Sequence, residues 1–177
     1  MQITIPYAPR ELQLEIHEQL AKHRWAVLSL HRRAGKSVMC INELIKRALT
    51  NKLWNPRYAY IGPTYKQTKS IIFDYLKHYA GVIPGIKFNE QELSCTFPNG
   101  AKITLLGSEN PDSLRGNYFD GIIADEYAQI NPRLFPEIIR PALSDRKGFC
   151  YMVGTPQGMS NDFYAKYQHA LQDLSLI

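Results

Sequence analysis

The sequence contains few cysteines and no long hydrophobic run, and both features narrow what the protein can be. Cys40, Cys95 and Cys150 are odd in number and lie far apart in apolar segments, so we expect buried thiols rather than a disulfide framework or a zinc site. No apolar run approaches the ~20 residues that span a bilayer, and the N-terminus lacks the basic-then-apolar profile of a signal peptide. We therefore predict a cytoplasmic protein with no membrane partner.

Repeats, low-complexity tracts and interdomain linkers are also missing, which favours a single folded unit. The 177 residues suffice for one domain with a sizeable core, and 45% hydrophobic with 21% charged residues is typical of a globular protein. The formal net charge of +5 permits a polyanionic partner such as DNA or RNA without requiring one. We predict a single domain over residues 1–177.

A phosphate-binding loop is predicted between a short apolar strand and an amphipathic helix. Residues 25–30 have the character of the strand, residues 38–48 have helical spacing, and Gly35, Lys36 and Ser37 lie at the junction. In this order the backbone N–H groups and the positive end of the helix face the phosphates. Lys36 would reach the β- and γ-oxygens, and the Ser37 hydroxyl would bind Mg²⁺.

The loop departs from the usual G-x-x-x-x-G-K-[ST] pattern. The first glycine would fall at Leu30, and two arginines, Arg32 and Arg33, crowd the loop. The tight turn must therefore be made in another way. Taken alone, the tripeptide is also compatible with the ordinary solvated start of a helix.

Two adjacent acids after another apolar strand are the second strong signal. Residues 119–124 precede Asp125 and Glu126 directly. Neighbouring carboxylates are costly to place together unless a cation or a basic group is close. Asp125 would hold Mg²⁺ through its waters, and Glu126 would polarise the water that attacks the γ-phosphate. Together with the upstream loop, this pair predicts a nucleoside triphosphatase rather than two helix-capping acids.

Strand-like and helix-like segments alternate along most of the chain, which predicts an α/β fold with a mainly parallel sheet flanked by helices. The expected strands cover residues 25–30, 58–63, 119–124 and 148–153, and the expected helices cover residues 9–22, 38–48, 65–79 and 160–174. Residues 134–143 also have helical spacing, but Pro136 and Pro141 should kink or break that helix. Between residues 86 and 107, β-type runs flank a Pro-Asn-Gly turn, which predicts an antiparallel hairpin added to the sheet.

Further polar residues lie where a nucleotide site in such a fold would use them. Gln13, on the first predicted helix, can hydrogen-bond an adenine edge, although an exposed helical glutamine is the simpler interpretation. Thr155 and Gln157 follow the last predicted strand in a Gly-Thr-Pro-Gln-Gly turn. There they can sense a γ-phosphate or simply form a turn.

The ordered set of motifs resembles the N-terminal ATPase domain of the large terminase of tailed bacteriophages, which packages DNA. The motifs are HRRAGKS, IGPTYKQ, a hairpin followed by SLRG, IIADEYA and GTPQG, and the similarity runs over residues 9–158. The resemblance implies a P-loop NTPase fold of the RecA-like (ASCE) class that uses ATP and Mg²⁺ to drive viral double-stranded DNA into a procapsid. It also implies sequence-independent DNA binding, a homo-oligomeric ring, portal and small-subunit partners, and a location in the host cytoplasm.

The resemblance assigns roles to individual residues of this sequence. The nucleotide contacts would be Gln13, Arg33, Ala34, Gly35, Lys36, Ser37, Asp125, Thr155 and Gln157. Ser37 and Asp125 would also bind the metal, and Thr155 and Gln157 belong to a coupling motif. Glu126 would be the catalytic base and Arg32 the arginine that senses the γ-phosphate.

Arg115 falls where such motors are proposed to carry an arginine finger that acts on a neighbouring subunit. The simpler interpretation is a loop arginine that pairs with Asp112 or Glu109, worth under ~1 kcal/mol. Large terminases continue into a lid subdomain and a nuclease domain, and neither fits the residues that follow Gly158. We therefore expect no DNA cleavage by this chain.

Two other functions share some of these features. One half of a superfamily-2 helicase has an upstream glutamine, a Pro-Thr strand end and an Asp-Glu pair, but it needs a second similar domain. Such helicases also use Ser-Ala-Thr where this chain has Gly-Thr-Pro-Gln. The other alternative is a nucleotide-dependent DNA-binding module that does not hydrolyse its nucleotide, and the presence of Glu126 argues against it.

Overall fold

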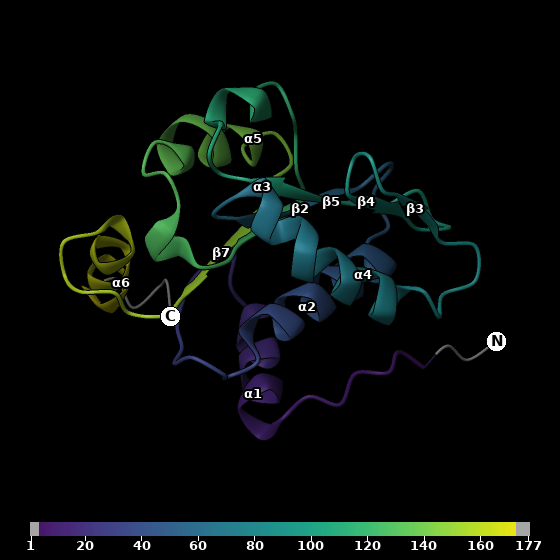
Figure 1. Cartoon of the computed structure of the whole chain (residues 1–177), viewed down its shortest axis with the longest axis horizontal. Helices are drawn as coiled ribbons and strands as arrows, with labels where there is room; N and C mark the ends of the chain where they lie inside the picture. Colours follow the sequence, from purple (N-terminus) through teal and green to yellow (C-terminus); the bar gives the residue numbers. More distant parts are fainter. Residues whose placement is uncertain (1–3, 173–177) are drawn as a thin grey trace.

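A seven-stranded sheet forms the centre of the computed structural model, which describes residues 4–172 (Figure 1). Its strands lie in the order β1-β7-β6-β2-β5-β4-β3. They are β1 (Trp25–Ser29), β2 (Arg57–Gly62), β3 (Lys87–Asn89), β4 (Ser94–Thr96), β5 (Lys102–Gly107), β6 (Gly121–Ala124) and β7 (Phe149–Gly154). Strands β1, β7, β6, β2 and β5 pair in parallel in this order, whereas β4 pairs antiparallel with β5 and β3 pairs antiparallel with β4. The predicted mainly parallel α/β fold with an antiparallel hairpin is confirmed.

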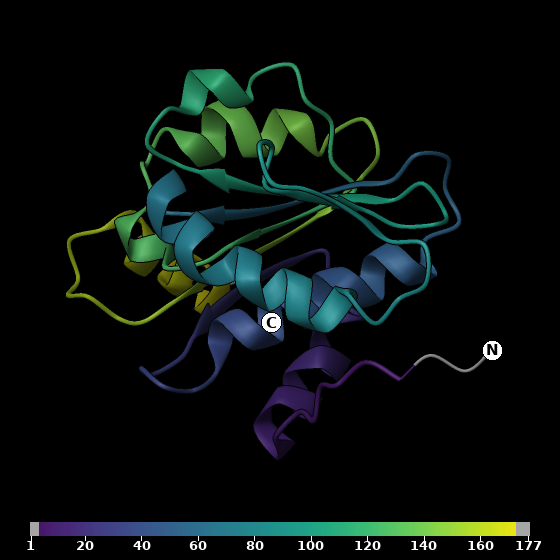
Figure 2. The ribbon, with the colours of Figure 1, turned by 45° about the vertical axis from the view of Figure 1, so that its right-hand side comes forward.

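Helices cover both faces of the sheet (Figures 1 and 2). On one face lie α1 (Glu11–Leu20), α2 (Lys36–Thr50), α3 (Tyr65–Gln67), the π-helix η1 (Thr68–Ile72) and α4 (Phe73–Ala80). On the other lie the 3₁₀-helices η2 (Pro111–Leu114) and η3 (Tyr127–Gln129), the π-helix η4 (Phe135–Ile139), α5 (Arg140–Ala142) and α6 (Asp162–Gln172). No helix within residues 4–172 is long and apolar enough to cross a membrane.

The sheet separates two hydrophobic clusters, which explains why its central strands are apolar on both faces. Along β2, Tyr58 and Tyr60 point into the cluster beneath α1, α2 and α4, whereas Ala59 and Ile61 point into the cluster beneath η4 and α6. All three cysteines are buried free thiols, as predicted, and burial raises the pKa of Cys95 to about 12. This packing fixes the ends of the strands, where most of the predicted site residues lie.

Two predicted helices contain π-turns that the sequence pattern does not indicate. Residues 65–79 form one helical stretch interrupted by η1, and the Thr68 side chain inside it donates to the Thr64 carbonyl at 2.9 Å. In the proline-containing segment, η4 and α5 follow each other without a gap, so Pro136 and Pro141 change the helix type instead of ending it. The last helix is described up to Gln172, and its predicted final residues lie outside the described residues.

Candidate functional site

The predicted phosphate-binding loop connects β1 to α2, and two left-handed residues shape it. Gly35 has φ +76° and caps the start of α2, and Arg33 has φ +65°. A Cβ atom at Gly35 would lie 2.7 Å from Nε2 of Gln13, so only glycine fits this position without a shift of that side chain. The loop thus turns without a glycine at position 30, because Arg33 adopts the left-handed conformation.

Gln13 packs beneath this loop and is 5% exposed, so the interpretation as an exposed helical residue is wrong. Its Nε2 donates to the carbonyls of Ala34 at 3.4 Å and Gly35 at 3.2 Å. Its Oε1 accepts from the Arg10 backbone N–H at 2.9 Å, so the side chain also caps the start of α1. Both ends of the amide are bonded to the protein itself, and contact with adenine stays a prediction.

Lys36 is buried at the start of α2, where three segments meet. Its Nζ donates to Thr155 Oγ1 at 2.9 Å and to the His31 carbonyl at 3.4 Å. The same nitrogen lies 3.7 Å from Oε1 of Glu126. The structure therefore brings together a lysine, a carboxylate and a hydroxyl that the sequence placed on three separate predicted loops.

Asp125 lies next to this group and is 1% exposed. Its Oδ2 accepts from Ser37 Oγ at 2.7 Å and from the hydroxyl of Tyr60, and its Oδ1 accepts from the Glu126 backbone N–H at 2.8 Å. Burial is the main cause that holds the pKa of Tyr60 well above its usual value, and the negative charge of Asp125 is the second. The hydroxyl therefore remains a donor. Sequence reasoning missed Tyr60, because only the pairing of β2 with β6 brings it to this carboxylate.

The residue after Asp125 has an unusual backbone. Glu126 has φ +50°, and its side chain is 37% exposed to the space in front of Lys36. Left-handed non-glycine residues are uncommon and often occur at functional sites. This turn separates the two acids, so that Asp125 points into the protein and Glu126 points towards the pocket.

A cavity of about 370 Å³ lies in front of the loop. Its lining residues are Arg32, Arg33, Gly35, Lys36, Ser37, Val38, Ile71, Tyr75, Glu126, Gln129 and Gln157. Most of the predicted site residues therefore share one cavity. Four of the lining residues were not predicted as site residues: Val38, Ile71, Tyr75 and Gln129. Ile71 and Tyr75 lie four residues apart, the spacing that places side chains on one helix face.

The donors at this site fit Mg²⁺ better than a transition metal. Ser37 supplies a hydroxyl and Asp125 a carboxylate, and Mg²⁺ typically takes one or two such protein ligands and leaves other positions to water and phosphate oxygens. Within residues 4–172 no group of three or more His, Cys, Asp or Glu side chains could hold a metal ion.

Arg115 lies apart from the cavity in front of the loop. Its guanidinium donates to Asp112 at 2.8 Å and to Glu137 at 2.9 Å, and it lines a separate cavity of about 540 Å³. Pairing with Asp112 was one of the two simple expectations. The other expected partner, Glu109, instead accepts from the Tyr65 backbone N–H at 2.7 Å.

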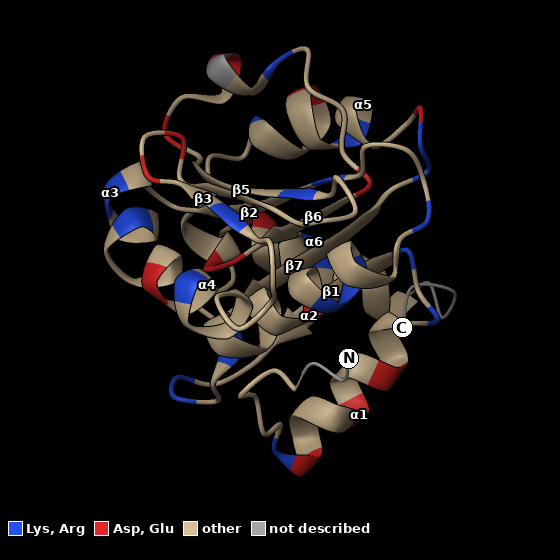
Figure 3. Cartoon of the chain, turned by 90° about the vertical axis from the view of Figure 1, so that its right-hand side faces the viewer, with Lys and Arg blue, Asp and Glu red and all other residues tan. Residues whose placement is uncertain are grey.

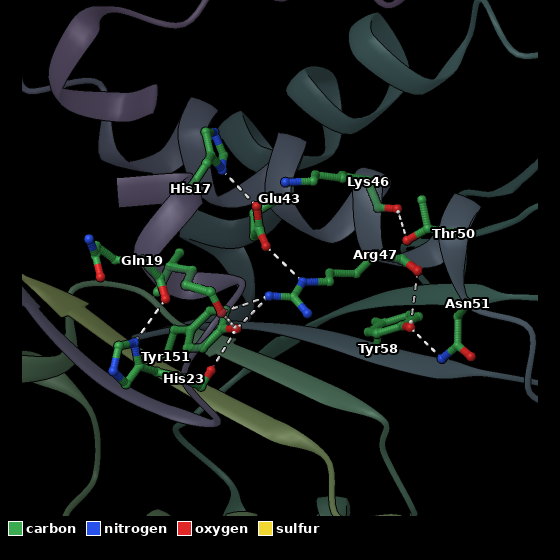
Figure 4. A network of polar contacts seen from close by, with 11 residues as sticks. His17, Gln19, His23, Glu43, Lys46, Arg47, Thr50, Asn51, Tyr58 and Tyr151 are labelled. Atoms are coloured by element: carbon green, nitrogen blue, oxygen red, sulfur yellow. Dashed lines mark hydrogen bonds and ion pairs between the residues drawn. The ribbon is translucent and has the colours of Figure 1, made fainter. Parts of the chain in front are cut away.

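A second buried polar network, which the sequence did not indicate, lies farther along α2 (Figure 4). Glu43 is 0% exposed and accepts from His17 Nδ1 at 2.6 Å and from Arg47 Nε at 2.7 Å. Arg47 also donates to the hydroxyl of Tyr151 at 2.9 Å and to the Leu20 carbonyl at 2.8 Å. Burial raises the pKa of Glu43, but the bonds from His17 and Arg47 outweigh burial, and the net direction is down.

The network also extends to the N-terminal segment. The Tyr7 hydroxyl lies 3.0 Å from Nε2 of His17. Because the Nδ1 side of the ring donates to Glu43, Nε2 can accept the Tyr7 proton when the ring is neutral. The network therefore joins the chain before α1 to α1, α2 and β7.

Comparison with known proteins identifies the family. The family model described as "Terminase large subunit, T4likevirus-type, N-terminal" matches residues 27–175. The chain belongs to this family. The terminase large subunits of Thermus virus P23-45 and Thermus phage G20c are each 30% identical to it over 181 aligned residues, which cover 89% of this chain and 36% of each relative. The chain thus spans about a third of the length of these terminases.

Solved terminase structures share the fold. The ATPase domain of the Thermus phage P74-26 large terminase is 28% identical, with a TM-score of 0.76 over 91% of this chain and 70% of that one. The large terminase of bacteriophage HK97 has a TM-score of 0.79 at 16% identity, over 97% of this chain and 39% of that one. The P-loop fold expected for a terminase ATPase domain is therefore confirmed.

Proposed function

We propose that this chain is the ATP-hydrolysing domain of a phage packaging motor, in which Mg²⁺-dependent hydrolysis of ATP drives viral double-stranded DNA into a procapsid. The observation that carries the proposal is the convergence of Lys36, Ser37, Asp125 and Glu126 at the carboxyl ends of β1 and β6. Ligands in open α/β sheets bind at this edge. The similarity to the P74-26 ATPase domain supports the same activity.

The chain's own groups can perform each part of phosphoryl transfer to water. Lys36 would leave Thr155 and Glu126 and bind the β- and γ-phosphate oxygens. Glu126, released from that pairing, would accept the proton of the attacking water. Ser37 and Asp125 would hold Mg²⁺, which neutralises charge that develops on the phosphates. When Lys36 leaves Thr155 for the γ-phosphate, Thr155 would be free to move, and this movement would pass to Gln157 and the residues that follow.

The motor-level properties follow from family membership and are part of the proposal. The domain would bind DNA through its phosphates, without sequence preference and with a steep dependence on salt. Figure 3 shows Lys and Arg on several elements, α3 and α4 among them, rather than on one helix that could enter a groove. We further propose ring assembly at the portal in the host cytoplasm, contact with the small subunit, and no nuclease activity within residues 1–177.

Removal of the lysine tests the nucleotide site directly. Lys36→Ala should abolish most ATP binding in calorimetry and all phosphate release, because it supplies the cation for the β- and γ-oxygens. Lys46→Ala is the matched control, since Lys46 lies on the same helix with an exposed side chain. Wild-type nucleotide affinity in Lys36→Ala would overturn the assignment of the loop.

Arg115 would act as an arginine finger on the adjacent subunit, where such a group is worth ~10³–10⁵ in rate. In this proposal Arg115 leaves Asp112 and Glu137 when nucleotide binds or the ring assembles, and it then contacts the γ-phosphate bound to the neighbouring subunit. Arg115→Ala should bind ATP without stimulated turnover, and mixed with Lys36→Ala in assembled rings it should recover activity that neither has alone. Arg133→Ala, which also removes an arginine partner of Glu137, is the control. An inactive mixture in verified rings contradicts the finger role.

A further inference from the structure

Tyr60 contributes a buried hydroxyl to the nucleotide site from the centre of the sheet. It is 2% exposed and lies on β2, which pairs with β6 so that Tyr60 lies beside Ile123. The Asp125 backbone N–H continues this pairing by donating to the Ile61 carbonyl at 2.9 Å. This register carries Asp125 to the end of the Tyr60 ring, where the phenol donates to Oδ2 at 2.5 Å.

Three donors from three elements fix the Asp125 carboxylate. Ser37 and Tyr60 both donate to Oδ2, and the Glu126 backbone N–H donates to Oδ1. Ser37 must also face the metal, so its contact with Asp125 is the one that nucleotide binding will adjust. Tyr60 is not among the described residues that line the cavity, and its bond can persist in every nucleotide state.

We propose that Tyr60 is a positioning residue for the metal site: its hydroxyl orients the Asp125 carboxylate so that Ser37 and Asp125 present their oxygens together. The inference rests on the proposed function, because it assumes that these two residues bind Mg²⁺ with ATP. Tyr60 is not among the described residues that line the cavity, so it would act on the metal only through Asp125. Groups that orient a ligand in this way commonly change metal affinity when they are removed, by 10–100-fold in typical cases.

Tyr60→Phe tests the hydroxyl with little change of volume. ATP binding is measured by calorimetry, first in EDTA and then across a Mg²⁺ titration, with no turnover involved. The affinity in EDTA should stay within about twofold of wild type, because the loop and Lys36 are intact. Mg²⁺ should raise the ATP affinity, and the Mg²⁺ concentration that gives half of this increase should be about 10-fold higher in Tyr60→Phe than in wild type.

Tyr58→Phe is the matched control. Tyr58 lies two residues earlier on the same strand and face, is also 2% exposed, and bonds to Asn51 and to the Arg47 carbonyl instead of Asp125. It should lose stability without any shift in the Mg²⁺ requirement. Tyr60→Leu offers a second side chain without a hydroxyl, and it should shift the Mg²⁺ requirement in the same direction.

A double-mutant cycle separates orientation of Asp125 from general loosening of the site. In an Asp125→Asn background, where the proposed metal ligand is already lost, Tyr60→Phe should cause no further loss of ATP affinity at any Mg²⁺ concentration, because the hydroxyl is proposed to act only through that carboxylate. An unchanged Mg²⁺ requirement in Tyr60→Phe, or an equal shift in Tyr58→Phe, would overturn the inference alone. Failure of the unaltered chain to bind ATP would overturn the proposed function and this inference with it.

Discussion

Helix α2 carries one polar cluster at its start and another along its second half, and the two differ in how completely their charges are paired. In the second cluster both oxygens of Glu43 accept bonds of 2.6 and 2.7 Å, and the side chain is 0% exposed. In the first, Lys36 is 3.7 Å from Glu126, whose side chain is 37% exposed beside a cavity. The fully bonded Glu43 cluster stabilises the fold. The looser ion pair leaves Lys36 and Glu126 able to exchange each other for a ligand.

The largest difference between the clusters should appear in catalysis. Glu126→Gln keeps the size of the side chain and some of its hydrogen bonding but removes the base, so turnover should fall by about 10²–10⁴. Phosphate release measures turnover, calorimetry measures ATP binding, and urea unfolding measures stability. ATP binding and stability should remain near wild type. An equal loss of binding and turnover would indicate a structural role for Glu126.

Glu43→Gln should give the opposite result. Removing the charge takes the counter-ion from Arg47, whose side chain is 26% exposed. The free energy of unfolding should therefore fall, by less than the ~3–5 kcal/mol typical of a fully buried ion pair. Glu92→Gln is the control, because Glu92 pairs with Lys102 at an exposed position and should have little effect. Urea unfolding gives the difference. A stable Glu43→Gln variant with impaired ATP binding would break the distinction between the clusters.

The second cluster should also make the protein sensitive to acid. The pKa of Glu43 is lower in the folded state than its ordinary value of 4.5, so the unfolded chain binds the proton more readily. Its stabilising contribution is therefore complete above that value and is lost as the pH falls towards the folded-state pKa. Urea unfolding between pH 6 and pH 3 should show a shallower loss for Glu43→Gln than for wild type; equal slopes would exclude this contribution.

Gln13 should show the smallest effect, because it supports the loop without carrying charge. Gln13→Ala removes two bonds to the carbonyls of Ala34 and Gly35 and the bond that caps α1 at Arg10. The two loop bonds at roughly 1 kcal/mol each amount to about 2 kcal/mol, so ATP and GTP affinities should fall together by at most about 30-fold. Gln19→Ala, at an exposed position on α1, is the control for both nucleotides. A selective loss of ATP binding would instead favour the predicted adenine contact.

The two clusters also differ in how far the sequence could reveal them. Lys36, Ser37, Asp125 and Glu126 were predictable because each follows a strand, and parallel strands bring their carboxyl ends to one edge. The hairpin was predictable from its Asn-Gly turn.

Glu43, His17 and Tyr151 carry no comparable signal, since their contact depends on how three elements pack. The same holds for Tyr60, which looks like any strand tyrosine, and for Gln13, whose amide finds its partners only after α1 packs below the loop. The π-turns of η1 and η4 were missed because helical spacing does not distinguish them from α-helix.

Within the described sheet, β1 is one of the two edge strands, so the predicted phosphate-binding loop is attached to a strand with only one neighbour, β7. Strands β6 and β2 are paired on both sides. Amide hydrogens of β1 should thus exchange with solvent sooner than those of the inner strands, since opening the edge breaks fewer bonds. The predicted phosphate-binding loop is therefore attached to an edge of the sheet that opens more easily than the inner strands, and a bound nucleotide should slow exchange at this edge.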